Sequence, residues 1–145
     1  VIKKFLKLVD KVIVATSYNI NKDYFFTIDE RIEIIKRSLY KDLKLNKKKI
    51  EIISFDTLTI NLCKKYKAKI IIRGLRAVSD FEYEFQLAGM NKKLSNEIET
   101  VFLMSDIENQ IISSNFVKEI AKLGGKVDNF LTKSAVKTLK RKINE

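Results

Sequence analysis

The chain has 145 residues, 46% of them hydrophobic, and its 29 lysines and arginines against 18 acidic residues give a net charge of +11. Because histidine is absent and Cys63 is the single cysteine, the sequence offers no Ser-His-Asp or Cys-His catalysis, no histidine-bound metal and no disulfide framework. The length suits one domain with a buried core. No apolar run is long enough to span a membrane, and without a signal-peptide pattern we expect a cytoplasmic protein.

The basic excess favours an anionic partner. A nucleic-acid-binding module is one alternative, but the sequence contains no such motif and no stripe of basic and aromatic residues. We therefore expect most lysines to be solvated, and neither nucleic acid nor membrane to be bound. The five arginines are more informative, because a guanidinium suits paired hydrogen bonds to phosphate; they are Arg31, Arg37, Arg73, Arg76 and Arg141.

The first third of the chain predicts a helix end, a strand and a second helix. Residues 1–9 carry apolar side chains at helical spacing, and residues 11–17 form a β-branched run typical of a buried parallel strand. A polar loop over 18–26 leads to the capping box of Thr27 and Glu30, which is a helix start signal. The apolar face of that helix consists of Ile28, Ile32, Ile35 and Leu39.

The strand and helix pattern repeats in the middle of the chain. A strand over 50–55 precedes a helix that Asp56 or Thr57 can cap, with Cys63 as a small buried apolar group. The apolar face predicted for this helix consists of Leu58, Leu62 and Tyr66.

The next strand, over 69–72, is followed directly by the segment Arg73-Gly74-Leu75-Arg76 and then by a helix over 80–94. Ser79 and Glu82 form a second possible capping box. We expect Phe81 and Phe85 to face the core, because they lie one helical turn apart.

The last third predicts a fourth strand and two helices. The strand covers 99–104, and Ser113 or Ser114 caps a helix that ends at Gly124-Gly125. The final helix covers 133–143.

This alternation predicts one α/β domain over residues 1–145, with a parallel sheet and right-handed crossovers. Ligands of such sheets bind beyond the carboxyl ends of the strands. The segments at those ends are 18–26, 56–59, 73–80 and 105–115.

Three features can bind a ligand. Two of them lie in these segments, and the third lies in the helix after the third strand. Arg73 and Arg76 can each bind a phosphate, and Gly74 permits close approach of the backbone to a ligand. The helix start at Ser113 can bind an anion. Glu84 fits neither a cap nor a core position and can accept hydrogen bonds from a sugar or base. A solvated surface turn and an ordinary serine N-cap remain the alternatives for the first two features.

The chain resembles the bacterial phosphopantetheine adenylyltransferases over nearly its whole length. The segments that carry the resemblance are FFTIDERIEII (25–35), IIRGLRAVSDFEYEFQLAGMN (71–91), VFLM (101–104) and IISSNFVKEIAKLGGKV (111–127). The resemblance implies a Rossmann-like nucleotidyltransferase fold. It also implies transfer of AMP from ATP to 4′-phosphopantetheine with Mg²⁺, which gives dephospho-coenzyme A and pyrophosphate. A homohexamer and coenzyme A as a product-like ligand are implied as well.

The resemblance also implies roles for single residues. Lys22 and Arg73 would hold the phosphate of phosphopantetheine, and the backbone of Thr59 would contact its pantetheine arm. The residues implied to bind ATP are Gly74, Leu75, Arg76, Glu84, Asn109, Gln110, Ile111, Ile112, Ser113, Ser114 and Asn115. Two of these depart from the family pattern: Asn109 stands where Trp is common, and Asn115 where a third Ser or Thr is usual.

A larger departure concerns the family's first strand and its T/H-x-G-H motif, because Val1 corresponds to a residue just past that motif. The resemblance therefore implies a chain without the motif histidine, with no catalytic residue and no metal ligand of its own. In the family sheet order 3-2-1-4-5, the strands at 11–17 and 69–72 would each keep an unpaired edge. An inactive truncated remnant that retains weak nucleotide binding is the alternative to an active enzyme.

Overall fold

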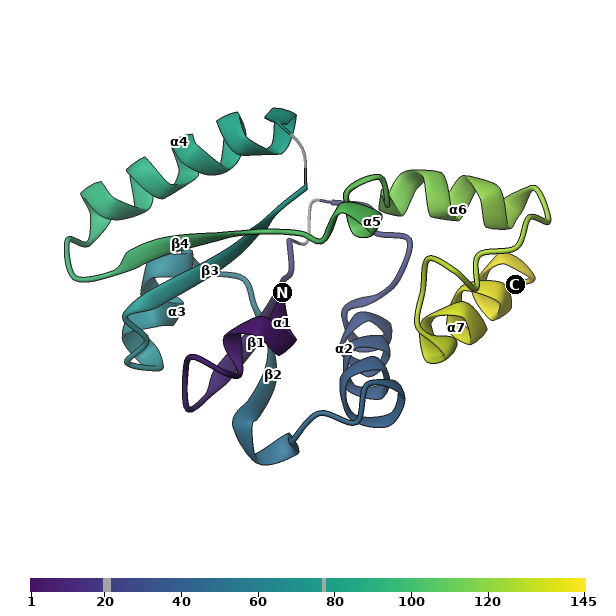
Figure 1. The fold of residues 1–145 in the computed structure, drawn as a ribbon, viewed down its shortest axis with the longest axis horizontal. Coiled ribbons are helices and arrows are strands. Elements are labelled where there is room, and N and C mark those ends of the chain that lie inside the picture. Colours follow the sequence, from purple (N-terminus) through teal and green to yellow (C-terminus); the bar gives the residue numbers. More distant parts are fainter. Residues whose placement is uncertain (20–21, 77) are drawn as a thin grey trace. The chain divides into compact units, whose positions relative to one another are not determined.

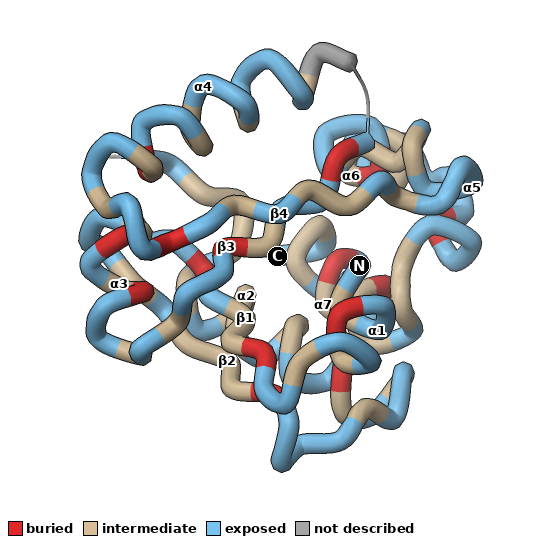
Figure 2. Tube along the Cα trace, turned by 60° about the vertical axis from the view of Figure 1, so that its left-hand side comes forward, coloured by how far each residue is buried: buried red, intermediate tan, exposed pale blue. Residues whose placement is uncertain are grey.

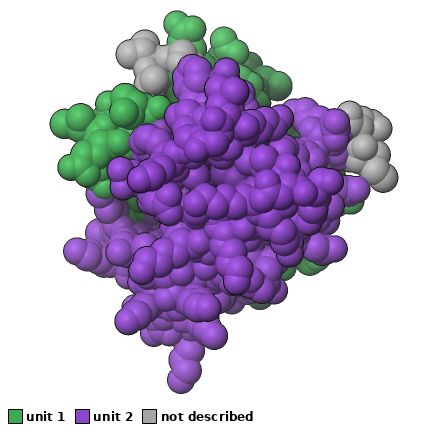
Figure 3. All heavy atoms as spheres, turned by 90° about the vertical axis from the view of Figure 1, so that its right-hand side faces the viewer, with its two compact units in different colours: residues 1, 56–111 green, residues 2–55, 112–145 purple. Residues whose placement is uncertain are grey.

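The computed structural model describes residues 1–19, 22–76 and 78–145, without the side chains of 78 and 79. Its contacts divide the chain into two compact units (Figure 3). Unit 1 contains residue 1 and residues 56–111, and unit 2 contains residues 2–55 and 112–145. The predicted capping box of Ser79 and Glu82 depends on a side chain that lies outside the description.

The strands of the described residues form two parallel pairs, β1 with β2 and β3 with β4 (Figure 1). β1 (Val12–Ser17) and β2 (Ile50–Phe55) belong to unit 2, and β3 (Ile70–Leu75) and β4 (Glu99–Met104) to unit 1. These are the pairs that the expected strand order requires. The α/β class with parallel strands and helices between them is thereby confirmed.

Unit 2 begins with a short helix, α1 (Ile2–Phe5), whose Phe5 is buried. After β1, the predicted capping box starts α2 (Ile28–Lys36): the Thr27 side chain accepts from the Glu30 N–H, and the Glu30 carboxylate accepts from the Thr27 N–H. The helix continues as a π-helical segment, η1 (Arg37–Asp42), which buries Leu39 as predicted. A 3-10 turn, η2 (Lys47–Lys49), leads to β2.

The largest buried cluster of unit 2 joins its two C-terminal helices. These are α6 (Ser114–Lys122) and α7 (Lys133–Ile143), and the cluster consists of Val117, Val127, Val136 and Leu139. Phe25 and Phe26, from the segment before α2, pack against the same cluster. α6 ends as predicted, since Gly124 has a φ of +79°, a conformation that favours glycine.

Unit 1 contains the β3–β4 pair and the helices α3 (Thr59–Lys65), α4 (Val78–Leu94) and α5 (Ile107–Gln110). Ile71 of β3 packs with Ile60 and Cys63 of α3. Phe102 of β4 makes an edge contact with Phe81 of α4. Because Arg73 is the register partner of Phe102, α4 covers the face of the pair that carries these two residues.

Four predictions for unit 1 were wrong in detail. β3 extends three residues further than predicted, so Arg73, Gly74 and Leu75 lie inside the strand. α3 begins after Leu58, which supplies no side-chain cap, and Ile60 and Cys63 form its buried face. Phe81 and Phe85 stack on each other and remain 45% and 62% exposed. Helix α5 was not expected at all.

Candidate active site

The carboxyl ends of β3 and β4 bring several predicted site residues of unit 1 to one edge of the strand pair. Gly74 pairs with Leu103 and Leu75 with Met104, and the Ser105 N–H donates to the Leu75 carbonyl at 2.8 Å. The segment after β3 enters α4 and the segment after β4 enters α5. Both connections therefore leave from the edge where ligands of parallel sheets bind.

Arg73 is held at this edge by Glu84 of α4. Its Nε and Nη2 donate to the two carboxylate oxygens at 2.6 and 2.5 Å, and the Glu84 side chain is only 12% exposed against 43% for Arg73. The hydrogen bond to Glu84 raises the pKa of the guanidinium, which stays charged at every physiological pH. Among the described residues Nη1 has no hydrogen-bond partner, so this end of Arg73 can bind an oxyanion.

The neighbours of Arg73 occupy the same edge. Arg76 donates from Nε to the Asp80 carboxylate at 3.1 Å, across the start of α4. A Cβ added to Gly74 would lie 3.1 Å from a methyl group of Val1, which is tighter than ordinary packing. Gly74 lies within an extended strand and has no positive φ. A glycine at this position therefore allows close approach of another group to the backbone, and it is not needed for a left-handed turn.

The other predicted residues of unit 1 lie on α3 and α5. Thr59 is the first residue of α3 and is partly buried. Asn109 and Gln110 belong to α5, and the Gln110 amide donates to the Ser105 carbonyl at 3.4 Å, which ties α5 to the end of β4. Ile111 follows this helix and is exposed.

The remaining predicted ATP-binding residues belong to unit 2. Ser113 is the N-cap of α6, and its hydroxyl accepts the Asn115 N–H at 3.3 Å. Ser114 and Asn115 form the first turn, where helical N–H groups point outward. Ile112 packs against the buried cluster of unit 2 and anchors this helix start. A helix with such a start attracts anions.

Lys22 lies in the segment that connects β1 to α2. It is exposed, and its backbone N–H donates to the Asn19 carbonyl at 3.1 Å. Phe25 of this segment packs against the core beneath α6, with the ammonium groups of Lys118 and Lys122 each 5.7 Å from its ring centroid. The segment with Lys22 and the helix that Ser113 caps thus rest on one core.

The sequence did not single out Arg31 for this region. Its Nη1 donates to the Ser17 carbonyl at 2.9 Å, and its guanidinium lies over the Tyr24 ring at 4.7 Å. The available signal was the small number of arginines, because each is a candidate for a planar, multiply bonded role.

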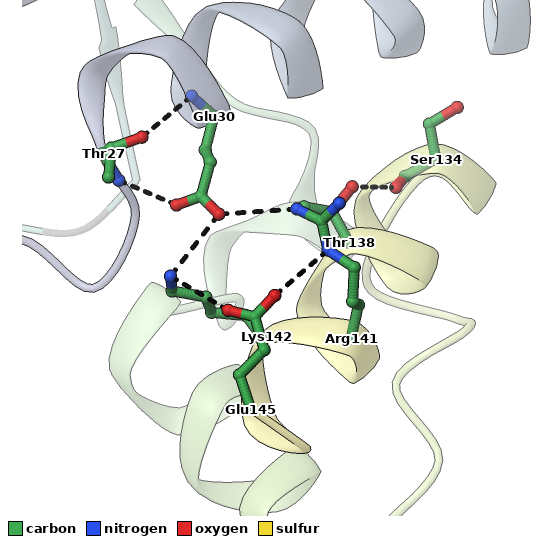
Figure 4. Close-up of polar contacts among 7 residues, drawn as sticks. All are labelled: Thr27, Glu30, Ser134, Thr138, Arg141, Lys142 and Glu145. Carbon is green, nitrogen blue, oxygen red and sulfur yellow. Dashed lines mark hydrogen bonds and ion pairs between the residues drawn. The ribbon is translucent and has the colours of Figure 1, made fainter.

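An ionic network fastens α7 to the capping box of α2 (Figure 4). The Glu30 carboxylate accepts from the Thr27 N–H at 2.9 Å and lies 3.4 Å from Arg141 and 3.5 Å from Lys142. Glu145 lies near the same two cations, at 3.5 and 3.2 Å. The backbone hydrogen bond from Thr27 is the main reason that the pKa of Glu30 is lowered, although partial burial opposes it.

The described residues contain no group of three or more His, Cys, Asp or Glu side chains placed to hold a metal ion. No helix within them has the length and apolar character needed to cross a bilayer.

Comparison with known proteins gives concordant matches. A family model described as cytidylyltransferase-like matches residues 1–120. The phosphopantetheine adenylyltransferase of Pelagibacter ubique (strain HTCC1062) is 66% identical over 142 residues, which cover 98% of this chain and 87% of that protein. The phosphopantetheine adenylyltransferase of Rhizorhabdus wittichii is 42% identical, over 100% of this chain and 85% of that protein. The one of Clostridium botulinum (strain Alaska E43 / Type E3) is 43% identical, over 98% of this chain and 86% of that protein. The chain therefore belongs to the phosphopantetheine adenylyltransferase family of cytidylyltransferase-like proteins.

Proposed function

We propose that this protein transfers the adenylyl group of ATP to 4′-phosphopantetheine and releases dephospho-coenzyme A and pyrophosphate. The observation that carries the proposal is the 66% identity, over 98% of the chain, to a phosphopantetheine adenylyltransferase. Such identity does not favour the alternative of an inactive remnant. Two arginines held by carboxylates at the carboxyl end of β3 suit a pair of phosphorylated substrates.

The reaction joins an oxygen of the phosphopantetheine phosphate to the α-phosphorus of ATP while the bond from that phosphorus to the bridging oxygen breaks. Pyrophosphate leaves with the electron pair. Such transfers depend chiefly on positioning and on stabilisation of charge. We assign the phosphopantetheine phosphate to Lys22 and to Nη1 of Arg73, and the pantetheine arm to the backbone of Thr59.

ATP is assigned to the second set of residues. Arg76 would bind its phosphates, and Glu84 would accept a hydrogen bond from the nucleoside while it holds Arg73. The N-terminal turn of α6 would receive the triphosphate. The full set proposed for ATP is Gly74, Leu75, Arg76, Glu84, Asn109, Gln110, Ile111, Ile112, Ser113, Ser114 and Asn115.

Mg²⁺ is proposed to enter with ATP. This ion is commonly held by substrate phosphates and water with few protein carboxylates. It would neutralise the triphosphate charge, and no step assigned to the chain's own residues requires a metal bound by the protein. Coenzyme A, which contains the same pantetheine arm, is proposed as a product-like ligand, and a cytoplasmic location goes with the use of ATP.

Self-association is proposed, as the homohexamer that the family resemblance implies. Most of α4 is exposed (Figure 2), and several of its exposed residues are apolar. A helix with apolar residues around its circumference is typically buried against a partner. The exposed apolar residues of α4 are Phe81, Tyr83, Phe85, Met90 and Leu94.

The direct test is a product assay on the complete natural protein with ATP, Mg²⁺ and 4′-phosphopantetheine. Mass spectrometry should detect dephospho-coenzyme A in amounts equal to the pyrophosphate released. Arg73→Gln should reduce turnover at low phosphopantetheine concentration, whereas Arg37→Gln, at a pair exposed on unit 2, should not. Pyrophosphate release without dephospho-coenzyme A, or no product from a folded protein, would refute the proposal.

A further inference from the structure

Arg31 is the arginine of unit 2 that reaches both sides of the segment containing Lys22. It extends from α2, where Nη1 donates to the carbonyl of Ser17 at 2.9 Å. Ser17 is the last residue of β1, so this hydrogen bond fixes Arg31 to the carboxyl end of the strand. The same guanidinium lies 4.7 Å from the centroid of the Tyr24 ring, two residues beyond Lys22.

This double contact requires an arginine. A guanidinium is planar, so it can lie over an aromatic ring while an N–H in its plane donates to a carbonyl. A lysine ammonium has no such plane and would satisfy the carbonyl or the ring less well. The pair of contacts therefore joins the end of β1 at Ser17 to the ring of Tyr24.

Arg31 lies in the first turn of α2, which is fixed by hydrogen bonds and ion pairs. It lies one residue after Glu30, which completes the capping box with Thr27 and pairs with two cations of α7. On the other side of Tyr24, Phe25 and Phe26 pack against the core of α6 and α7. The segment that follows Lys22 is thus held between α2 and α6.

We propose that Arg31 is a positioning residue that sets the place of Lys22 through Ser17 and Tyr24. The proposal rests on the proposed function, in which Lys22 binds the phosphate of phosphopantetheine. Lys22 itself is exposed, and a flexible exposed lysine binds more weakly when its backbone is not fixed. Arg31 contributes by holding that backbone and does not touch the substrate.

The kinetic test compares Arg31→Gln and Arg31→Lys with the parent protein. Arg31→Gln should raise KM for phosphopantetheine about fivefold, the scale of one lost hydrogen bond with part of a stacking contact, while KM for ATP stays near the parent value. The KM of Arg31→Lys for phosphopantetheine should lie between the values of the parent and of Arg31→Gln. Arg37→Gln is the matched control, because Arg37 pairs with Glu33 in a neighbouring exposed position.

Tyr24 provides a second and independent test. Tyr24→Phe keeps the ring and should behave like the parent, whereas Tyr24→Leu should raise the same KM as Arg31→Gln does. If the two residues act as one unit, the double variant Arg31→Gln/Tyr24→Leu should be no worse than either single variant. Additive effects, or equal rises in the KM values of both substrates, would contradict the proposal.

A readout that does not depend on activity separates this proposal from the proposed function. In hydrogen exchange, a peptide over residues 22–26 should exchange faster in Arg31→Gln than in Arg37→Gln. Unchanged exchange would overturn the role of Arg31, whatever the protein catalyses. Faster exchange in Arg31→Gln, together with a parent protein that forms no dephospho-coenzyme A, would contradict the proposed function. It would still support the role of Arg31 in holding this segment.

Discussion

Glu84 and Arg73 illustrate how one pair can serve two ligands. The carboxylate occupies the Nε side of the guanidinium and leaves Nη1 pointing elsewhere. Since Glu84 is assigned to ATP and Arg73 to phosphopantetheine, the proposed sites of the two substrates meet in this ion pair.

Replacing Glu84 by glutamine should weaken the paired hydrogen bonds that hold the Arg73 guanidinium. The variant keeps the size of the side chain but removes the negative charge and one acceptor. Charge-assisted hydrogen bonds are worth about 1.5–3 kcal/mol, so KM for phosphopantetheine should rise roughly tenfold. Steady-state kinetics with each substrate varied in turn would measure this change.

Glu82→Gln is the matched control, since Glu82 is an exposed carboxylate on the same helix. It should leave both KM values unchanged. If Glu84→Gln also left the KM for phosphopantetheine at its parent value, the ion pair would have no part in substrate binding.

At the scale of helices, the network around Glu30 predicts a pH-dependent contribution to stability. The pKa of Glu30 lies below its ordinary value of 4.5, mainly because of the backbone hydrogen bond from Thr27. A carboxyl whose pKa is lower in the folded state stabilises the fold above its unfolded pKa, and this contribution is lost as the pH falls through the folded pKa. The melting temperature of Glu30→Gln should therefore lie below that of the parent at pH 7, and the gap should narrow below about pH 4.5.

Glu33→Gln serves as the reference, because Glu33 forms an exposed pair with Arg37 outside the network. Its melting temperature should differ little from the parent, as exposed ion pairs contribute little. The difference in melting temperature between Glu30→Gln and the parent could instead stay constant from pH 7 to pH 3. That result would show that the charge of Glu30 does not stabilise α2 and α7.

Two glycines at helices should respond to alanine in opposite directions. Gly124 follows α6 with a φ of +79°, so Gly124→Ala should destabilise by about 1 kcal/mol. Gly89 lies inside α4 with no atom within 4 Å of an added Cβ, so Gly89→Ala should stabilise by about 0.5–1 kcal/mol. Chemical denaturation of both variants would measure the difference, and equal signs would disprove the backbone assignment.

Local patterns predicted the elements better than they predicted their faces. The capping box at Thr27, the N-cap at Ser113 and the bounds of α7 were read correctly, because each depends on neighbouring residues. The buried face of α3 and the exposure of Phe81 and Phe85 depend on what other segments cover, which spacing alone does not reveal.

The site was predictable in a similar way. The resemblance pointed to the residues at the end of β3, but it did not reveal that Glu84 pairs with Arg73. The contacts of Arg31 with Ser17 and Tyr24 were likewise invisible in the sequence, because they join residues that are adjacent only after folding.

For the whole molecule, the exposed face of α4 predicts self-association. Tyr83→Glu places a charge on this face and should shift the protein to a smaller species in light scattering at micromolar concentration. Lys93→Glu, at an exposed charged position of the same helix, should leave the molar mass unchanged. If the parent protein is a monomer, or if Tyr83→Glu leaves the assembly intact, α4 is not the contact between copies.

Transfer of an adenylyl group to phosphopantetheine can be followed directly with ATP that is labelled either on the α-phosphate or on the γ-phosphate. The labelled ATP reacts with 4′-phosphopantetheine in the presence of Mg²⁺. Adenylyl transfer places the α-label in dephospho-coenzyme A and the γ-label in pyrophosphate. Appearance of the γ-label in a phosphorylated pantetheine product together with ADP would contradict the account.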